Sequence, residues 1–518
     1  MLFNICCLFM FICGACVLFV KSGVLSLSIL TLNGIYWNSL LFLDLIGLSI
    51  LLMLMICFSY ALFYTNHYFS GDLAGIELNS IIILFVSIMA SLVLTGDFLT
   101  TLIFWEYLGV VSFFLILFYN NYLSLRSSII TLVSSRFGDV CLFLIIAVSI
   151  LGGLPIVFSV IIFFIIFTKS ASFPFTSWLL EAMRAPTPVS SLVHSSTLVA
   201  AGVWFSMRYD IFNYINDTTV FLSVLLLTIF ITGVCCFFFL DLKKIVALST
   251  CNNIAWCIVY LICGNVVLSL FQLVSHGVSK CLLFMLVGDV MSGTGGSQAS
   301  NCVYSSQLYG NWGIFGLFSI VLGLSGAPFI GVFFTKHFLI SVLNSSFNIP
   351  LVSFLFCCVF LSYFYSFRLC SILINLNTSI ASGVLYAFSS GTLVYMWLFI
   401  NYFTALTLNE TSNVSLRFSI FLIMFQLLSC LSAYFLYNST LLRNWSSSIF
   451  GCDNLIEESF IFLKQFSNTV SLFFFRWDNN FLLLLNNNGA NFINIYSYGI
   501  LNIIMMSIIF ILMCWFII

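Results

Sequence analysis

The chain has 518 residues, of which 62% are hydrophobic and 6% are charged, and its mean hydropathy is +1.20. A soluble domain has about a quarter of its residues charged, so this composition excludes a soluble protein. The formal net charge of −1 argues against nucleic acid as a partner.

Long apolar runs recur along the whole sequence. Each has about 20 residues, the length that an α-helix needs to cross a bilayer. Backbone groups in lipid must form their hydrogen bonds within the segment, so we expect helices rather than an open sheet. The predicted fold is an all-α polytopic membrane protein with about 15 transmembrane helices. The predicted spans are 2–20, 40–64, 77–95, 98–119, 125–150, 155–181 (broken), 187–208, 219–240, 243–263, 266–290, 311–345 (broken), 350–374, 382–403, 417–437 and 495–517.

The first of these spans, 2–20, has the length of a secretory signal peptide. It lacks the basic leader and the small-residue cleavage site of such peptides, so we interpret it as a membrane helix. Its Cys13 and Cys16 lack the strand–helix context of a redox motif, and we expect them to be buried small hydrophobes.

Glu106 is an acidic residue inside the predicted span 98–119. A charge at the bilayer centre costs roughly 2.5–3.5 kcal/mol on insertion scales, so this carboxylate must be paired or protonated. Arg136 and Asp139 follow on the next span, at an i, i+3 spacing that would let them pair. Two interpretations remain open for Glu106, a role in proton transfer or a structural ion pair with a basic residue such as Arg136.

Residues 169–202 place a lysine, three prolines and a histidine in a stretch of membrane depth. Pro174 has no N–H, and its ring clashes with the carbonyl four residues earlier, so it should break the helix that contains Lys169. Transporters build ion sites near mid-membrane from broken helices of this kind. We expect Lys169 to pair reversibly with Glu106. His194 and the hydroxyl groups beside it would relay protons, and the alternative is a satisfied interior histidine.

The span 266–290 carries Gln272, His276 and Lys280 at positions i, i+4 and i+8. The three polar side chains therefore share one helical face. This stripe is a candidate path for protons or water, and the alternative is a hydrogen-bonded seam between two helices.

A second proline break is predicted in the span 311–345, where Pro328 precedes Lys336 and His337. Lys336 could be a late relay or exit residue, or it could extend its ammonium group to the membrane surface. Arg368 stands alone in the middle of a later span, and the sequence indicates no role for it.

Residues 452–488 differ from the rest, because polar residues recur among Phe and Leu at intervals of three or four residues or their multiples. This pattern predicts an amphipathic helix that lies along the membrane surface. The alternative is an ordinary span with a polar flank, although its charges make a single crossing costly. The polar stripe consists of Asp453, Glu457, Lys464, Asn468 and Arg476.

At these residues the chain resembles the antiporter-like membrane subunits of respiratory complex I. The resemblance covers residues 40–375 densely and in order, and beyond 375 it rests on architecture. The motifs are WEYLGVVSFFLI at 105–116, SRFGDV at 135–140, KSASFPFTSWL at 169–179, PTPVSSLVHSSTLVAAG at 186–202, DLKKIVALST at 241–250, SHGVSKCLLFM at 275–285 and GAPFIGVFFTK at 326–336.

The resemblance implies two half-channels for protons, joined by a polar central axis. It implies a proton-relay role for Glu106, Lys169, His194, His276, Lys280 and Lys336, with Arg136, Asp139, Pro174 and Pro328 as supporting residues.

Two segments each contain a proline-broken span with a lysine nearby, which suggests two inverted five-helix repeats. The predicted organisation is N-terminal membrane helices at 1–96, a first antiporter-like repeat at 97–208, a second at 219–375, additional membrane helices at 376–451, a lateral helix at 452–490 and a C-terminal anchor helix at 491–518.

The sequence departs from the family pattern at three places. Gln272 stands where the family often has histidine, so a relay there would need water. His337 follows Lys336 where an aspartate is common, so an acidic exit partner would have to come from elsewhere. Arg184 replaces the usual glutamate before the Pro-Thr-Pro motif, and we expect a compensating pair with Glu181.

These observations predict a proton-translocating core subunit of respiratory complex I, whose electron transfer from NADH to ubiquinone occurs in other subunits. Two alternatives remain, a subunit of a multi-subunit cation/proton antiporter and a structural membrane subunit that conducts nothing.

The expected partners are the other complex I subunits, above all the neighbouring antiporter-like ones, and the lipid bilayer. We expect no cofactor or metal in this chain, and FMN, iron–sulfur clusters and ubiquinone in partner subunits. The expected location is the mitochondrial inner membrane, because 61 Phe and 19 Cys against 6 Pro suit a thymine-rich organelle gene.

Overall fold

The computed structural model describes a large part of the chain, which divides into two units, Met1–Cys452 and Asp453–Ile518. The predicted span 2–20 lies outside the described residues, as do nearly all of 495–517 and most of 382–403. The described residues are 23–32, 35–151, 155–215, 218–292, 296–300, 302–303, 305–306, 310–326, 331–336, 339, 349–374, 378–379, 397–398, 401, 416–436, 457–471 and 507.

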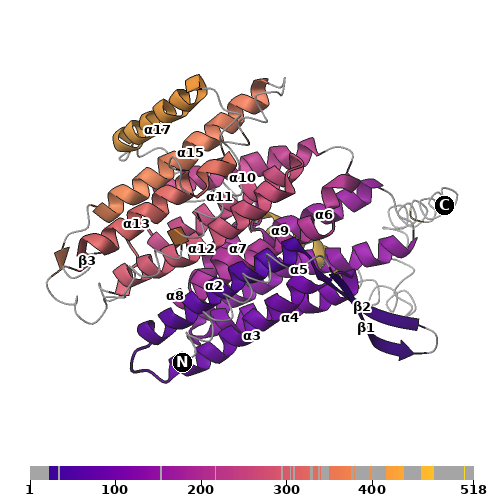
Figure 1. Ribbon diagram of the computed structural model, residues 1–518. Coiled ribbons are helices and arrows are strands. Elements are labelled where there is room, and N and C mark those ends of the chain that lie inside the picture. Colours follow the sequence, from indigo (N-terminus) through magenta and orange to yellow (C-terminus); the bar gives the residue numbers. More distant parts are fainter. Residues whose placement is uncertain are drawn as a thin grey trace, which may run out of the picture. The chain divides into compact units, whose positions relative to one another are not determined.

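Helices dominate the first unit, as the sequence predicts (Figure 1). Within the described ranges, nine helices are long and apolar enough to cross a membrane, and the total of about 15 stays a prediction. The helices are α2 (Leu45–Tyr68), α3 (Ala74–Leu94), α4 (Phe98–Leu117), α5 (Tyr122–Leu151), α6 (Pro155–Lys169), α7 (Ser177–Ala182), α8 (Thr187–Val189), η1 (Ser190–Thr197), α9 (Leu198–Arg208), η2 (Ile211–Tyr214), α10 (Thr219–Phe238), α11 (Leu242–Ile262), α12 (Val266–Ser292), α13 (Gly310–Ser325), α15 (Ile349–Ile374) and α17 (Leu416–Leu436).

The helices of this unit run side by side, with α3 and α4 at one edge and α15 and α17 at the other (Figure 1). In between, α10 packs against α11 and α15, and α11 packs against α12. The α8–η1–α9 segment, α11 and α12 are almost wholly buried, whereas α5 exposes most of its length. These buried helices carry His194, Gln272, His276 and Lys280.

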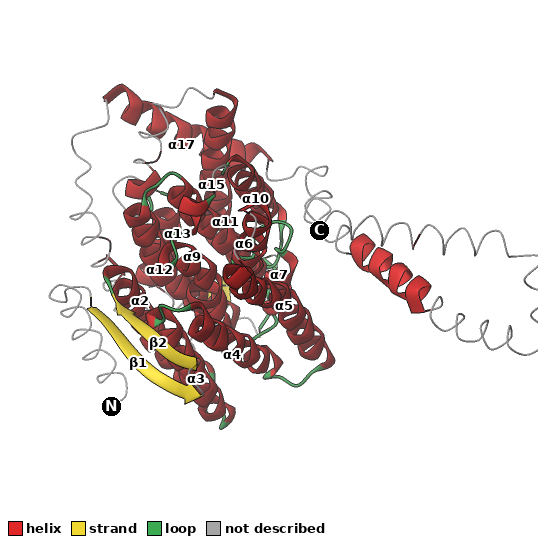
Figure 2. Ribbon diagram, turned by 90° about the vertical axis from the view of Figure 1, so that its right-hand side faces the viewer, coloured by secondary structure: helices red, strands yellow, loops and turns green. Residues whose placement is uncertain are grey.

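A β-hairpin near the N-terminus corrects the all-helical prediction (Figure 2). Strand β1 (Gly23–Leu32) pairs antiparallel with β2 (Ile35–Leu43), with Gly23 opposite Leu43 and Leu32 opposite Ile35. The local signals were the Leu–Ser alternation at 25–28, which has the period of a strand, and the Asn33–Gly34 dipeptide, a frequent hairpin turn. Two short strands, β3 (Ser305–Ser306) and β4 (Thr378–Ser379), pair in parallel elsewhere.

The hairpin shortens the predicted span 40–64, because α2 begins only at Leu45. Asp44 has extended backbone and accepts a hydrogen bond from the Gly47 N–H at 3.1 Å, so it caps the helix at this point. Arg208 Nη1 donates to Asp44 Oδ2 at 2.6 Å, and its Nη2 donates to the Val93 carbonyl at 2.7 Å. One buried guanidinium thus ties the ends of α2, α3 and α9 together.

The predicted span 155–181 is broken, as the proline indicates. Helix α6 ends at Lys169, Ala171 has a positive φ of 53°, the Phe173–Pro174 peptide bond is cis, and α7 begins at Ser177. Trp178 Nε1 donates to the Thr168 carbonyl at 3.0 Å, so a side chain from beyond the break binds a carbonyl at the end of α6. The cationic Lys169 lies at the C-terminal end of a helix, where the helix dipole favours positive charge.

The predicted span 187–208 contains a feature that the sequence did not indicate, the π-helix η1 around His194. Its wider turn is stabilised by hydroxyl groups, since Thr197 Oγ1 donates to the Leu192 carbonyl five residues earlier at 2.9 Å. Single π-helical turns inside α-helices occur frequently at functional sites.

The predicted span 311–345 is also interrupted. Helix α13 ends at Ser325, Gly326 follows with a positive φ of 96°, and residues 333–336 are helical again. Pro328 and His337 lie outside the described residues.

In the second unit, residues 457–471 form a helix whose side chains are all exposed. Helical structure is thus confirmed for this part of the predicted lateral helix. Its placement along a membrane surface stays a prediction, as does the whole of the proposed domain division.

Candidate functional site

Four ionisable side chains form a continuous series of contacts across α4, α5 and α6. Arg136 Nη1 contacts Glu106 Oε2 and lies 3.5 Å from Asp139 Oδ2. Asp139 Oδ1 in turn lies 3.5 Å from Lys169 Nζ. The side chains of Glu106 and Arg136 are 27% and 38% exposed, whereas those of Asp139 and Lys169 are 2% and 0% exposed. The series therefore leads from a half-buried pair to a fully buried lysine.

This arrangement corrects the expectation that Glu106 pairs with Lys169 itself. The ion partner that the structure gives Glu106 is Arg136, the alternative that the sequence left open. Arg136 and Asp139 share one turn of α5, and α5 packs against both α4 and α6, so their side chains stand between the glutamate and the lysine. The i, i+3 spacing of this arginine and aspartate was the sequence signal for the link.

Lys169 is held by an aromatic ring as well as by the carboxylate. Its Nζ lies 5.1 Å from the centre of the Trp105 ring, a distance at which a cation and a π-system attract each other. It has no hydrogen-bond partner among the described residues, and neither oxygen of Asp139 has one. The ammonium group is thus stabilised by charge and by the ring, without fixed hydrogen bonds, and is free to change partner.

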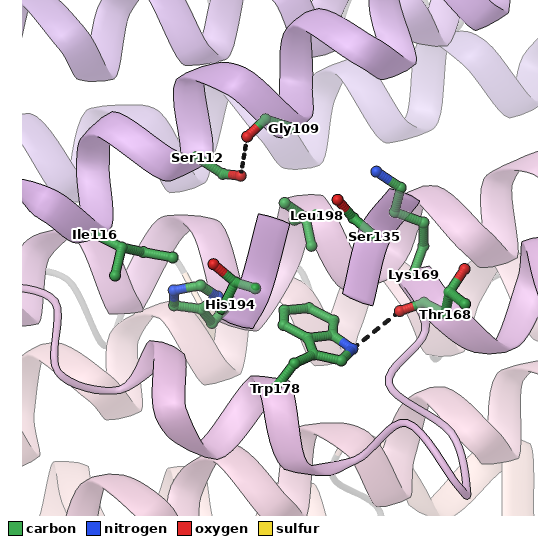
Figure 3. A pocket seen from close by; sticks show the side chains of 10 residues that line it. Gly109, Ser112, Ile116, Ser135, Thr168, Lys169, Trp178, His194 and Leu198 are labelled. Carbon is green, nitrogen blue, oxygen red and sulfur yellow. Dashed lines mark hydrogen bonds between the residues drawn. The ribbon is translucent and has the colours of Figure 1, made fainter. Parts of the chain in front are cut away.

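A small cavity joins Lys169 to His194, with Trp178 between the two (Figure 3). It has room for about one water molecule. A water molecule here would find polar partners in the hydroxyl groups of α4 and α5. The residues that line the cavity are Gly109, Ser112, Ile116, Thr131, Ser135, Thr168, Lys169, Trp178, His194 and Leu198.

His194 is buried in η1, and neither ring nitrogen has a hydrogen-bond partner among the described residues. Both interpretations of His194 stay open, because a water molecule in the cavity would give a ring nitrogen its partner. Ser195, Ser196 and Thr197 donate their hydroxyl protons to backbone carbonyls of the same helix, so these protons are already engaged. The free ring nitrogens and the cavity make water the better relay partner for His194.

The stripe on α12 faces α11. Lys280 Nζ donates to the Val246 carbonyl at 3.3 Å and to Ser249 Oγ. Gln272 Nε2 donates to Asn253 Oδ1 at 3.5 Å. His276 lies between them along the helix and is 1% exposed. Gln272 and Lys280 thus form a hydrogen-bonded seam with α11, and the role of the stripe as a path for protons or water stays a prediction.

Lys336 is buried, which excludes the alternative that it extends to the membrane surface. Its Nζ donates to the Ser325 carbonyl and to Ser362 Oγ, both at 2.7 Å, and lies 5.3 Å from the Tyr363 ring centre. Ser325 is the last residue of α13, so the lysine binds a backbone carbonyl that the helix break leaves open.

Hydrogen bonds lead from Lys280 toward Lys336, mostly through side chains that the sequence analysis did not single out. Thr335 Oγ1 donates to Gln272 Oε1 at 2.6 Å, and Asn253 Nδ2 donates to the Ser249 carbonyl at 2.9 Å. The bonded residues are Lys280, Ser249, Asn253, Gln272 and Thr335, while Lys336 follows Thr335 in the chain and binds Ser362 and the Ser325 carbonyl instead; all of these residues are buried. Two adjacent asparagines inside the apolar span 243–263 were the available sequence signal.

Two of the sequence's open questions are answered by direct contacts. Arg184 Nε donates to Glu181 Oε2 at 3.1 Å, which confirms the expected compensating pair. Arg368 donates to the carbonyls of Cys236 at 3.0 Å and Phe239 at 2.8 Å, so it binds the C-terminal end of α10.

No group of three or more His, Cys, Asp or Glu side chains among the described residues could hold a metal ion.

Residues 95–364 match the family model described as NADH:quinone oxidoreductase/Mrp antiporter, transmembrane. Relatives named NADH-ubiquinone oxidoreductase chain 5 include that of Caenorhabditis elegans, with 35% identity covering 64% of this chain and 64% of the relative. That of Ascaris suum has 33% identity over 65% and 62%, and that of Anopheles arabiensis 31% over 64% and 89%. The alignment thus spans slightly less than two thirds of the first two relatives.

Solved structures share the fold. The Mrp complex from Dietzia sp. DQ12-45-1b superposes with a TM-score of 0.71 at 19% identity, covering 96% of this chain and 60% of that chain. The membrane-bound sulfane sulfur reductase, an archaeal respiratory membrane complex, gives 0.66 at 18% identity over 80% and 90%. On the family model's match, the chain belongs to the NADH:quinone oxidoreductase/Mrp antiporter transmembrane family.

Proposed function

We propose that this chain is a proton-translocating membrane subunit of respiratory complex I. The observation that carries the proposal is the buried Lys169 at the end of a broken membrane helix, with Asp139 as its ion partner and a cavity leading to His194. A buried lysine with a movable carboxylate can hold a proton when the pair is closed and release it when the pair opens. The named relatives are subunits of NADH-ubiquinone oxidoreductase, which supports this setting.

In the proposed path, protons move between Glu106, Lys169 and His194 in the first half of the chain. They continue through His276 and Lys280, pass along the hydrogen bonds of Gln272 and Thr335, and then reach Lys336, the next residue in the chain. Moving one charge against the membrane potential requires about 2.3 kcal/mol per 100 mV. Partner subunits that carry FMN, iron–sulfur clusters and ubiquinone would supply this energy, and the proposed location is the mitochondrial inner membrane.

A native gel of mildly solubilised source membranes tests the assignment to the complex. We expect the chain to migrate with a very large band that stains for NADH dehydrogenase activity. Migration in a smaller band without that activity would contradict the proposal.

The variant Lys169→Met tests the relay itself. Met has a similar length and no charge, so we expect the complex to assemble while NADH oxidation coupled to proton pumping falls severely. Roughly a hundredfold loss is typical when a group that transfers protons is removed. A normal number of protons pumped per electron pair would contradict the role of Lys169.

The second candidate function is a subunit of a multi-subunit cation/proton antiporter. It is favoured by the superposition on an Mrp complex over 96% of this chain. Sodium-dependent pH changes in vesicles that contain the chain, without any dependence on NADH, would move this function to first place.

A further inference from the structure

A second ionisable pair lies at the ends of α2 and α12, outside the relay described above. His67 Nε2 lies 3.4 Å from Asp289 Oδ1. The His67 side chain is 23% exposed and that of Asp289 is 2% exposed. His67 is in the last turn of α2, which ends at Tyr68, and Asp289 is in the last turn of α12, which ends at Ser292. The pair therefore joins the surface of the chain at a helix end to a buried carboxylate.

Hydroxyl groups continue from Asp289 into the protein. The Tyr64 hydroxyl, one turn before His67, faces the side chain of Thr187 at the start of α8. The approach is close, because a Cβ at Gly288 would lie 2.5 Å from the Tyr64 hydroxyl oxygen and 3.3 Å from Thr187 Cβ. Only glycine at this position lets α12 come so near to both groups.

Thr187 opens the segment that carries His194. Helix α8 runs directly into η1, and all residues of both are buried. Ser190 Oγ donates to the Thr187 carbonyl at 2.9 Å, and Ser191 Oγ donates to the Pro188 carbonyl at 2.7 Å. Buried hydroxyl groups thus line the stretch between Thr187 and His194, and because their protons are held by backbone carbonyls, a proton crosses this stretch with the help of water.

We propose that His67 and Asp289 form a proton-exchange site between the surface of the chain and His194. The proposal rests on the proposed function and adds the place where protons pass between water and the relay. The neighbours fit a site of this kind, since an imidazole and a carboxylate can each take up and release a proton. Among the described residues, His67 contacts Asp289 on α12 and has the Tyr64 ring 6.3 Å from its own, and Tyr64 in turn has Tyr68 and Tyr119 as titratable neighbours.

The step is a simple proton transfer. The imidazolium N–H bond at His67 Nε2 breaks and an O–H bond forms on the Asp289 carboxylate, which leaves a neutral imidazole and a neutral acid. The acid then passes its proton toward the hydroxyl groups of Tyr64 and Thr187, and His67 takes another from water. The separation of 3.4 Å exceeds a normal hydrogen bond by about 0.5 Å, so the ring must move slightly before the proton passes.

An ion pair that only ties α2 to α12 would have the same geometry, and amide variants distinguish the two roles. Asp289→Asn keeps the size and can still hydrogen-bond to His67, but it cannot take up a proton. His67→Gln keeps a donor and an acceptor but cannot titrate. Asp289→Glu keeps the acid and serves as the conservative variant. Glu77→Gln on α3 is the matched control, because Glu77 is an exposed carboxylate in the first turn of a neighbouring helix.

The measurement is the number of protons pumped per electron pair by the intact complex in sealed vesicles, with Lys169→Met as the reference. We expect Asp289→Asn and His67→Gln to lower pumping by roughly tenfold or more, since acid–base groups contribute about a hundredfold or more to the steps they serve. Asp289→Glu should keep most of the pumping, and Glu77→Gln should keep all of it.

The outcomes separate the two proposals. Normal pumping in Lys169→Met would overturn the proposed function. Loss of pumping in Lys169→Met with normal pumping in Asp289→Asn and His67→Gln would overturn the exchange site alone. If these two variants pump normally but unfold at a lower temperature, the pair is a structural tie between α2 and α12, and the exchange site is likewise overturned. If Asp289→Asn prevents assembly of the complex, the test rests on His67→Gln, because His67 is partly exposed. Normal pumping in His67→Gln then contradicts the exchange site.

Discussion

At the scale of the residue, Lys169 has exchanged its hydration shell for one carboxylate and one aromatic ring. Asp139 Oδ1 lies 3.5 Å from its Nζ, and the Trp105 ring centre lies 5.1 Å away. Neither contact fixes the ammonium group by hydrogen bonds, so a small change in the position of Asp139 alters the balance between charged and neutral lysine. The other oxygen of Asp139, Oδ2, lies near Arg136, which also contacts Glu106. The charge state of Lys169 is therefore linked to the Glu106–Arg136 pair.

Asp139→Asn should therefore impair pumping severely. Removing one partner of a buried ion pair costs about 3–5 kcal/mol, because the other charge is left unpaired. We expect the lysine to lose its proton and pumping to fall by roughly tenfold or more. The control is Asp241→Asn, which breaks an exposed pair with Lys244 at 3.4 Å and should leave pumping unchanged. Equal pumping in the two variants would contradict the role assigned to Asp139.

Gln272 replaces a residue that could titrate with one that can only form hydrogen bonds. Its amide oxygen accepts from Thr335, and its amide nitrogen donates to Asn253. Gln272→Leu takes the donor from the buried Asn253 Oδ1, at a cost of about 1–3 kcal/mol, while Thr335 keeps its hydrogen bond to the Val332 carbonyl at 2.9 Å. We expect Gln272→Leu to lower pumping severalfold in the reconstituted complex. Gln272→His, which keeps a hydrogen-bonding side chain, should retain most of the pumping of the original chain. A leucine variant that pumps normally would show that the bridge between Lys280 and Lys336 is not used.

At the scale of the element, the contact between α5 and α6 places the acid beside the lysine. Gly138 lies next to Asp139, and a Cβ at Gly138 would lie 2.3 Å from Thr168 Oγ1, next to Lys169. A side chain fits there only if the helices move apart or Thr168 turns away and loses its hydrogen bonds to the carbonyls of Phe164 and Ile165. The glycine is thus a requirement of packing, which the apolar pattern of α5 does not reveal.

Gly138→Val should separate α5 from α6 and lengthen the distance between Asp139 and Lys169. We expect a loss of pumping as large as that of Asp139→Asn, although both ionisable groups remain. Overpacking of this kind typically costs about 1–3 kcal/mol, so assembly should survive. Gly23→Ala, where a Cβ meets no atom within 4 Å, is the control. Unchanged pumping in Gly138→Val would mean that this contact is not needed.

Arg368 shows how a single charge can organise an element end. It donates to two carbonyls at the end of α10, and its guanidinium lies 5.2 Å from the Phe237 ring centre. Arg368→Leu leaves these carbonyls buried and unsatisfied, so we expect the complex to lose about 2 kcal/mol or more of stability. Thermal unfolding of the purified complex measures this, with pumping at low temperature retained. An unchanged midpoint would contradict the capping role.

At the scale of the whole molecule, the two units have different relations to their surroundings. The first unit buries its polar helices within itself. In the second unit, every described residue from 457 to 471 is exposed, including Phe460, Phe462 and Phe466. Large apolar side chains on a surface indicate contact with lipid or with another protein.

A chain that ends after Cys452 should therefore fold its first unit and lose its place in the large complex. We expect protease-resistant membrane helices but migration below the active band on a native gel. The full chain carrying only a C-terminal tag is the control. Co-migration of the shortened chain with NADH dehydrogenase activity would show that the second unit is not needed for assembly.

The sequence by itself determined the membrane class, the order of most spans and the residues that carry charge into the bilayer. It could do so because hydrocarbon penalises every unpaired charge and every open backbone group, so the signals are strong and local. It also located both helix breaks, since a proline lacks the N–H and clashes with the carbonyl four residues earlier, which is a strong local signal. The sequence analysis missed the hairpin at 23–43. The only strand signal there is the short Leu–Ser alternation at 25–28, and the end of the hairpin was assigned to the apolar span 40–64.

Tertiary structure alone decided which charges meet. Glu106 contacts Arg136, Lys169 contacts Asp139, and Gln272 reaches Thr335 on a segment 63 positions away. These pairs depend on which helices pack together and on their rotation, which periodicity along one helix cannot specify. The π-helix around His194 and the pairing of His67 with Asp289 depend on the same packing, because a hydrogen bond or an ion pair acts only over a few ångströms.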